Sequence, residues 1–315
     1  MPLPDITIDP IRDDLPFGSR VGGVTLEALE DPAVRGRLAA AFDERGLLIF
    51  EGVDPTPQVQ VAISTVFGPL KDHPSSATPR VGGDGMVGVI EIRHEPGEGG
   101  VVSFGGRELS QWLPWHFDHC YNDQLNRAGV LRSVTIPPDG GMTGFVDGIA
   151  LYEAIDPEVR AHVEGRTVRY AMDVILDNLR YGRPEGFVEV RQSAQASNVM
   201  DEYADRPYAL HPAVWTRATG EKVLLHVSPW MAKGVVGLDD DEADALLTEV
   251  CDEIVAKAEG LCYFHRWSPT DMVIWDNWRV LHSVSGSDPQ HGRCMHRTTI
   301  AGDYGLGAFE ESAPV

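Results

Sequence analysis

Two side chains that could bind a metal ion, His116 and Asp118, stand two positions apart in the first half of the chain. In an extended strand, residues i and i+2 point to the same face, so the imidazole and the carboxylate would project together. One neutral nitrogen and one hard anionic oxygen suit a divalent iron, which needs a second imidazole and open positions besides. A lone His-x-Asp is more often a surface or hydrogen-bonding pair, so the metal interpretation depends on the rest of the chain.

A second imidazole with a suitable context comes 166 positions after His116. The segment DMVIWDNWRVLH passes through a hydrophobic strand and a polar turn and ends at His282. A jelly-roll sheet can bring such a strand end beside a residue far away in the sequence. We therefore expect His282 to be the third ligand of the metal.

Two arginines, Arg293 and Arg297, follow His282 after eleven and fifteen residues. Arg297 lies in an apolar and threonine-rich segment, where an unpaired guanidinium would be costly, so it needs an anionic partner. A core aspartate or glutamate would satisfy this need, and so would the carboxylate of a small molecule. The sequence leaves both partners open.

Other polar residues near these motifs carry weaker expectations. His119 should lie on the strand face opposite His116, and His296 should face away from Arg297. Asp276 and Asn277 should shape the turn before the strand end, or support the metal ligands from behind. Three further histidines have no assignable role: His211, His226 and His265.

The elements that must position these residues are mostly short strands separated by turns. Helices are expected over 31–46, 56–68, 149–163 and 239–257, and strands over 47–50, 86–92, 130–136, 143–146, 167–172, 213–216, 223–227, 261–265, 272–275 and 295–301. Strands and helices do not alternate regularly, and there is no Gly-x-Gly-x-x-Gly at a strand-helix junction, which disfavours a parallel α/β sheet. The pattern predicts a mainly β fold with helical decoration, a two-sheet sandwich or jelly roll.

We expect one domain over residues 1–315, because 315 residues fit one elaborated domain. Residues 93–111 are rich in glycine and charge, which predicts a mobile lid-like loop beside the ligand pair, or a surface insertion. Residues 173–210 show weak periodicity, and we interpret them as a variable insertion.

Composition excludes several classes of function. A net charge of -22 without a basic stripe disfavours nucleic acid or an anionic membrane as a partner. No apolar run is long enough to span a bilayer, and the first residues lack a secretory signal, so we expect a cytoplasmic protein. The four cysteines form no Cys-x-x-Cys pair, which indicates reduced thiols. Cys120 lies closest to the ligand pair and is the thiol most exposed to oxidation there.

The ordered motifs resemble a known enzyme family. The series His116-x-Asp118, GGMTGF with Thr143, WDNWRVLH with His282, Gly-Arg293 and MHRTT with Arg297 is similar to the iron(II)/2-oxoglutarate-dependent dioxygenases related to taurine dioxygenase and 2,4-dichlorophenoxyacetate dioxygenase. The resemblance extends from about residue 20 to residue 303. It implies a double-stranded β-helix, the jelly-roll core of that family.

The resemblance also implies roles for individual residues. Those matching His116, Asp118 and His282 hold iron(II) in the family, and those matching Thr143 and Arg293 hold the distal carboxylate of 2-oxoglutarate. The residue matching Arg297 meets the substrate's acid group, and His73 matches a substrate-contacting histidine. An arginine fork and a threonine hydroxyl can together fix a diacid, which agrees with these roles.

The chain departs from taurine dioxygenase at two substrate positions. Ser76 stands where that enzyme has a tyrosine, and Trp112 stands where it has an asparagine, so taurine is disfavoured as the substrate. Aromatic residues near the motifs hint at a roomier aromatic lining, although most of these rings should belong to the ordinary core. They are Phe104, Trp112, Trp115, Tyr121 and Trp230.

The sequence therefore predicts a dioxygenase that uses iron(II), 2-oxoglutarate and O2 to hydroxylate a small organic acid, for example an aryloxy carboxylate or a sulfonate. Hydroxylation beside an oxygen, nitrogen or sulfur atom would also cleave the substrate. The main alternative is a catalytically silent jelly-roll protein that binds a metal or an acid, and zinc-dependent hydrolysis is a third interpretation. The family resemblance implies a homo-oligomer, a dimer or a tetramer.

Overall fold

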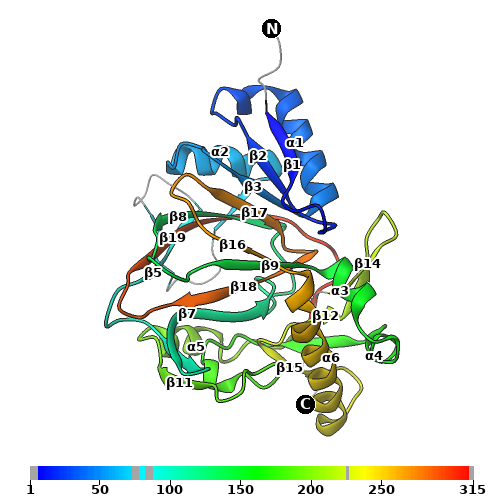
Figure 1. Ribbon diagram of the computed structural model, residues 1–315. Helices are drawn as coiled ribbons and strands as arrows, with labels where there is room; N and C mark the ends of the chain where they lie inside the picture. The colour runs from blue at the N-terminus through cyan, green and yellow to red at the C-terminus, as the bar shows by residue number, and fades with distance from the viewer. Residues whose placement is uncertain (1–5, 73–77, 82–87, 225–226, 312–315) are drawn as a thin grey trace.

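Two sheets face each other at the centre of the molecule (Figure 1). The computed structural model describes residues 6–72, 78–81, 88–224 and 227–311. In the larger sheet the strand order is β1-β2-β3-β17-β8-β19-β4, and β5 also pairs with β19. Its strands are β1 (Thr7–Pro10), β2 (Ser19–Gly22), β3 (Leu47–Phe50), β4 (Leu70–Lys71), β5 (Val89–His94), β8 (Ala128–Thr135), β17 (Met272–Asp276) and β19 (Arg293–Ile300).

The smaller sheet has the order β11-β6-β7-β18-β9-β16. Its strands are β6 (Val101–Phe104), β7 (Arg107–His116), β9 (Thr143–Asp147), β11 (Val188–Arg191), β16 (Tyr263–His265) and β18 (Val280–Ser287). Phe145 of this sheet packs against Trp275 of the larger one, within a buried cluster that fills part of the space between them. These facing sheets confirm the predicted mainly β, jelly-roll fold.

Two helices, α1 (Pro32–Arg45) and α2 (Pro57–Phe67), cover the outer face of the larger sheet (Figure 1). Asp31 caps α1 by accepting from the backbone N–H of Ala33 at 2.8 Å, and Thr56 caps α2. Gly46 ends α1 with φ of +70°, a left-handed conformation that favours glycine. Both helices were predicted, and each buries an apolar stripe against the sheet.

Most of the remaining elements lie below and to the right of the smaller sheet in Figure 1. They are the helices α3 (Gly148–Ala154), α4 (Pro157–Val163), α5 (Ala196–Tyr203) and α6 (Asp240–Leu261), the 3-10 turn η3 (Leu176–Asn178), and the strands β10 (Thr167–Tyr170), β12 (Ala209–Pro212), β13 (Val214–Thr216), β14 (Lys222–Leu224), β15 (Ala232–Val235) and β20 (Ala308–Phe309). The 3-10 turn η1 (Ala28–Glu30) instead contacts α1 and α2. None of the helices in the described residues is long and apolar enough to cross a membrane.

Two local predictions were wrong. The single helix expected over 149–163 is broken between α3 and α4, because Pro157 keeps Asp156 out of the helical conformation. The lid-like loop expected over 93–111 is largely the β6–β7 hairpin, whose strands bury Val102 and Leu109. The variable insertion expected over 173–210 contains η3, β11 and α5, and β11 extends the edge of the smaller sheet.

Candidate active site

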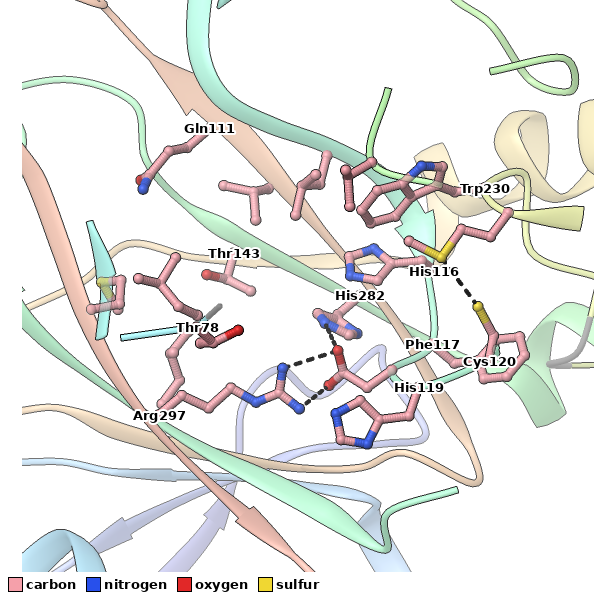
Figure 2. A pocket seen from close by; sticks show the side chains of 18 of the residues that line it. Thr78, Gln111, His116, Phe117, His119, Cys120, Thr143, Trp230, His282 and Arg297 are labelled. Carbon is pink, nitrogen blue, oxygen red and sulfur yellow. Dashed lines mark hydrogen bonds and ion pairs between the residues drawn. The ribbon is translucent and has the colours of Figure 1, made fainter. Parts of the chain in front are cut away.

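The three predicted metal ligands come together between the two sheets. In the pairing of β7 with β18, His116 lies directly opposite His282, and the centroids of their rings are 4.0 Å apart. Nε2 of His282 is 3.7 Å from Oδ1 of Asp118. The ligand atoms of the three residues all lie within 4.8 Å of one another, and all three side chains are buried. Figure 2 shows the imidazoles of His116 and His282 side by side in the cavity.

A bulge in β7 places His116 on the face that lines the site. Leu113 pairs with Val284 and His116 with His282, so three residue steps on β7 match two on β18. The extra residue reverses the alternation of the side chains. Gln111, Leu113 and His116 can therefore all line the same cavity, although the first two are odd-numbered and the last is even-numbered.

Asp118 does not share a strand with His116, contrary to the prediction. It lies in the turn that follows β7, where the side chain of Asn277 holds its main chain. Oδ1 of Asn277 accepts from the N–H of Asp118 at 2.7 Å, and Nδ2 donates to the carbonyl oxygen of Asp118 at 3.0 Å. Nδ2 also donates to Oδ1 of Asn126 at 3.0 Å. The buried Asn277 thus supplies the pairing that a neighbouring strand would give.

The electrostatic state of the cluster suits metal binding. Nδ1 of His116 donates to the carbonyl oxygen of Pro114 at 2.8 Å, which leaves the lone pair on Nε2. Burial lowers the pKa of both His116 and His282 below the ordinary value. Burial alone would raise the pKa of Asp118, but opposing electrostatic effects, of which the charge of Arg297 is the largest, hold this pKa below its usual range. Neutral imidazoles and an ionised carboxylate are the forms that bind metals.

The donor set fits iron(II). Two imidazole nitrogens and one carboxylate oxygen meeting at one point make up the 2-His-1-carboxylate arrangement, which leaves positions open for other ligands. The cluster contains no thiolate, the ligand that would favour Cu(I) or a structural zinc. Cys120 lies two residues after Asp118, but its Sγ contacts Sδ of Met231 at 3.5 Å, and burial raises the pKa of the thiol.

Thr143 and Arg293 lie on the walls of the same cavity, from β9 and β19 respectively. Oγ1 of Thr143 accepts from Nε1 of Trp267 at 3.1 Å, which leaves the hydroxyl proton free to donate elsewhere. Arg293 is 3% exposed and, among the described residues, makes no ion pair. Its Nε donates to the carbonyl oxygen of Gly141 at 3.3 Å. A Cβ on Gly141 would come within 3.1 Å of that Nε, so the approach requires glycine.

One donor of Arg293 is left without a partner. Nη1 donates to Oε1 of Gln111 at 2.9 Å, whereas the buried Nη2 has no hydrogen-bond partner among the described residues. Burial lowers the pKa of Arg293 to about 10, because the lost hydration outweighs the smaller opposing effect of Cys294. A buried cation with an unpaired donor on a cavity wall fits a carboxylate ligand. The distal carboxylate of 2-oxoglutarate fits this position.

Arg297 meets a protein carboxylate, the first of the two partners that the sequence left open. Nη1 donates to Oδ1 of Asp118 at 3.0 Å, and Nη2 lies 2.7 Å from Oδ2 (Figure 2). Both side chains are 9% exposed. Its Nε has no hydrogen-bond partner in the part of the chain that the structure describes. Arg297 therefore neutralises the predicted metal ligand and also lines the cavity.

The cavity has a volume of about 400 Å³ and a mostly apolar lining. Its walls come from both sheets and from the segments around residues 172, 199 and 231; among them are Ile92, Leu113, Leu131, Met172, Val174, Val199, Trp230 and Met231. Thr78 also lines it. The predicted substrate residue His73, like Ser76 and His226, lies outside the described residues.

The predicted aromatic lining is only partly correct. Tyr121 and Trp230 line the cavity. Trp112 points to the other face of β7, where its ring lies 5.2 Å from those of Phe104 and Phe187. Trp115 packs against Phe264 instead, with ring centroids 5.9 Å apart.

Of the two histidines beside the ligand motifs, one lines the cavity and the other does not. His119 was expected on the opposite face but lines the cavity, because it lies in the turn with φ of +60°. His296 faces away from the cavity, as predicted. Its Nδ1 accepts from Nη2 of Arg132 at 2.7 Å, and its Nε2 lies 3.6 Å from Oε2 of Glu91.

Backbone strain gathers at this cavity. Among the described residues other than glycine, three have φ in the left-handed region, namely Gln111 at +51°, His119 at +60° and Met231 at +66°. All three line the cavity. Left-handed conformations at such residues are uncommon and cluster at functional sites.

Sequence reasoning missed two supports of the site. His211, for which no role was predicted, donates from Nε2 to the carbonyl oxygens of Cys120 at 3.0 Å and Asn122 at 2.9 Å, and thereby holds the turn that carries Asp118. Arg279 pairs with Asp147 through two contacts of 2.8 Å, which ties the turn before β18 to the end of β9. The only signal for the second was an arginine inside the WDNWRVLH motif.

Comparison with known proteins agrees with the fold and identifies the family. The model of the family "Taurine catabolism dioxygenase TauD, TfdA family" matches residues 7–299. The (S)-phenoxypropionate/alpha-ketoglutarate-dioxygenase of Sphingobium herbicidovorans is 31% identical over 92% of this chain and 93% of its own length. Pentalenolactone F synthase of Streptomyces arenae is 26% identical, with 95% and 96% of the two chains covered. The crystal structure of a taurine dioxygenase from Burkholderia xenovorans superposes with a TM-score of 0.70 at 24% identity, covering 98% of this chain and 97% of that one.

The fold and the buried His-Asp-His cluster define a jelly-roll protein whose central cavity could hold a metal ion in the 2-His-1-carboxylate arrangement. The chain belongs to the TauD/TfdA family of dioxygenases. The prediction of an enzyme of the iron(II)- and 2-oxoglutarate-dependent class is thereby confirmed, and the catalytically silent alternative is not favoured.

Proposed function

We propose that the enzyme couples the oxidative decarboxylation of 2-oxoglutarate to the hydroxylation of a small organic acid with an apolar body. The observation that carries this proposal is that three metal-binding side chains and an unpaired, buried arginine donor face one apolar cavity. Iron bound there would activate O2, and the four electrons that reduce O2 would come in equal parts from 2-oxoglutarate and from the substrate. One oxygen atom would enter succinate and the other the hydroxylated product, with release of carbon dioxide.

In this proposal His116, Asp118 and His282 hold the iron, and Thr143 and Arg293 hold the distal carboxylate of 2-oxoglutarate. Several contacts support the assignment. The hydroxyl of Thr143 and Nη2 of Arg293 each keep a donor for an added ligand. Because both residues line the cavity that contains the three ligands, one diacid could reach the metal with its keto-acid end and the arginine with the other.

Arg297 is the proposed contact for the acid group of the substrate. It lines the cavity, its Nε has no hydrogen-bond partner among the described residues, and it lies beside Asp118. An acid held there would place its carbon chain against the apolar wall near the metal. His73 is proposed as a further substrate contact on the family resemblance alone.

The lining favours a particular class of acid. Met172, Val174, Val199 and Trp230 offer apolar surface and few hydrogen-bond groups, so the body of the substrate should be apolar. One relative is named for phenoxypropionate, an acid with an aromatic body. An aryloxy or arylalkyl carboxylate is the first candidate, and a sulfonate is the second. A hydroxyl added beside the ether oxygen of an aryloxy acid would release a phenol.

A panel of acids would test the function. The purified enzyme with iron(II), ascorbate, 2-oxoglutarate and O2 would be given aryloxy carboxylates, arylalkyl carboxylates and sulfonates, and succinate would be measured. At least one acid should raise succinate formation well above the level without it, and Arg297→Ala should reduce this stimulation about tenfold or more. Equal stimulation in both proteins would remove Arg297 from substrate binding. Succinate formation that no acid increases, or that persists without metal, would contradict the proposed function.

We also propose that the enzyme is a cytoplasmic homo-oligomer, a dimer or a tetramer, that does not bind nucleic acid. The family resemblance supports the assembly, and the net charge of -22 is unfavourable for phosphate backbones. Light scattering coupled to size-exclusion chromatography would give the mass. A mass of about 34.5 kDa would show a monomer and refute the assembly.

A further inference from the structure

Gln111 occupies a strained position on the wall of the cavity. It lies within β7 with φ of +51°, and the residue at the corresponding place on β18 is Gly286, with φ of +71°. A Cβ on Gly286 would come within 2.9 Å of Cβ of Leu109 and 3.1 Å of Cβ of Trp112. The paired left-handed residues therefore require a glycine on β18. A glycine at 111 would relieve the remaining strain, yet the chain has a glutamine there.

The side chain of Gln111 spans the space between the sheets. From β7 of the smaller sheet, its Oε1 accepts from Nη1 of Arg293, on β19 of the larger sheet, at 2.9 Å. Because an arginine can only donate, the amide oxygen must face Arg293, and the amide nitrogen faces elsewhere. Figure 2 shows Gln111 on the same side of the cavity as Thr143.

The hydrogen bonds of Arg293 leave one direction open. Nε donates to the carbonyl oxygen of Gly141 at 3.3 Å, and Nη1 donates to Oε1 of Gln111 at 2.9 Å. The planar guanidinium is therefore held at two of its three nitrogens. The third, Nη2, is buried and has no hydrogen-bond partner among the described residues. A neutral acceptor at Nη1 fixes the plane of the guanidinium without neutralising its charge, whereas a carboxylate there would compete with an incoming acid.

We propose that Gln111 is a positioning residue, which holds Arg293 so that Nη2 points at the distal carboxylate of the cosubstrate. This inference rests on the proposed binding of 2-oxoglutarate by Thr143 and Arg293. It explains why a strained glutamine stands where glycine would fit the backbone better. If Gln111 had only a structural role, filling space or satisfying Nη1 of Arg293, replacing it would not change how the protein recognises a carboxylate.

Comparing the binding of two keto acids distinguishes a positioning role of Gln111 from a purely structural one. The protein would be loaded with Mn(II) in the absence of O2, and the dissociation constants of 2-oxoglutarate and of 2-oxovalerate would be measured by titration calorimetry. The two ligands share the keto-acid end and the chain length, but 2-oxovalerate has no distal carboxylate. The variants are Gln111→Gly, which removes both the amide and the strain, and Gln111→Glu, which places a competing carboxylate at Nη1.

For Gln111→Gly we expect the dissociation constant of 2-oxoglutarate to rise about tenfold and that of 2-oxovalerate to change less than about twofold. The melting temperature should change by only a few degrees, because relief of the left-handed strain opposes the loss of the hydrogen bond to Nη1. Gln111→Glu should weaken 2-oxoglutarate still further, again with little effect on 2-oxovalerate.

Two results would overturn the inference, namely unchanged binding of 2-oxoglutarate in both variants, or an equal loss for both ligands. Failure of the proposed function would look different, because the wild-type protein itself would then not bind 2-oxoglutarate in a metal-dependent manner. A fall in melting temperature of Gln111→Gly by many degrees would show that the side chain serves the fold, and would also count against a positioning role.

Discussion

Replacing Asn277 by alanine should weaken both the fold and the metal site. The amide of Asn277 makes hydrogen bonds of 2.7 Å and 3.0 Å to the main chain of Asp118 and one of 3.0 Å to Oδ1 of Asn126. Asn277 and Asn126 are both 0% exposed, so water does not readily replace these bonds. A net hydrogen bond contributes about 1 kcal/mol and an orphaned buried group costs about 1–3 kcal/mol, so the free energy of unfolding should fall by about 3 kcal/mol.

The same change should release the carboxylate of Asp118 from its place. Loss of a hydrogen-bonding group that orients a metal ligand typically lowers metal affinity about 10-fold to 100-fold. The assays are urea unfolding of the metal-free protein and calorimetric titration with Mn(II). Asn126→Ala is the matched control, because it removes the acceptor beside Asn277 but keeps both bonds to Asp118. It should lose stability and retain metal affinity within about threefold.

The reasoning would be refuted if Asn277→Ala bound Mn(II) like the wild-type protein. Equal losses of metal affinity in Asn277→Ala and Asn126→Ala would also refute it, because the effect would then follow from general destabilisation and not from the hold on Asp118.

Further predictions concern the metal ligand, a buried ion pair and acid stability. His282→Ala should lower Mn(II) affinity by at least about 100-fold while the circular dichroism spectrum stays native, and retained affinity would contradict its role. Arg279→Met should lower the free energy of unfolding in urea by about 3–5 kcal/mol, because it leaves the buried Asp147 carboxylate unpaired, and a loss below about 1 kcal/mol would be contrary to this account. Burial lowers the pKa of His211 to about 4, below its value in the unfolded chain, so the unfolded state binds a proton that the folded state lacks between pH 6.5 and about 4. Stability should therefore fall by about 2–3 kcal/mol on acidification through this range, and His211→Gln should flatten the fall; an unchanged slope would disprove the assignment.

The convergence of the three candidate metal ligands could be predicted because these residues occur in ordered, recognisable motifs. His116 and His282 are 166 residues apart, yet each lies in a short motif that the chain shares with the family. The structure places them opposite each other in neighbouring strands. The buried position of Arg297 could also be predicted, because a guanidinium in an apolar strand must have an anionic partner.

The sequence could not show which residues far apart in the chain contact one another in the site. The partner of Arg297 is Asp118, which was itself assigned to the metal, and nothing local connects residues 179 positions apart. Asp118 leaves the strand because of a bulge and a turn whose hydrogen bonds come from Asn277, and propensities do not reveal such long-range supports. Glycine and charge in 93–111 indicated a loop, whereas tertiary packing of Val102 and Leu109 makes it a hairpin. The left-handed conformation of Gln111 has no local sequence signal.

A crystal structure with Mn(II) and N-oxalylglycine, a diacid that stands in for 2-oxoglutarate, would test the central claim most directly. The account predicts one strong anomalous peak bounded by His116, Asp118 and His282, with the distal carboxylate of the diacid against Thr143 and Nη2 of Arg293. Metal bound elsewhere, or a diacid whose distal carboxylate lies away from Arg293, would contradict it.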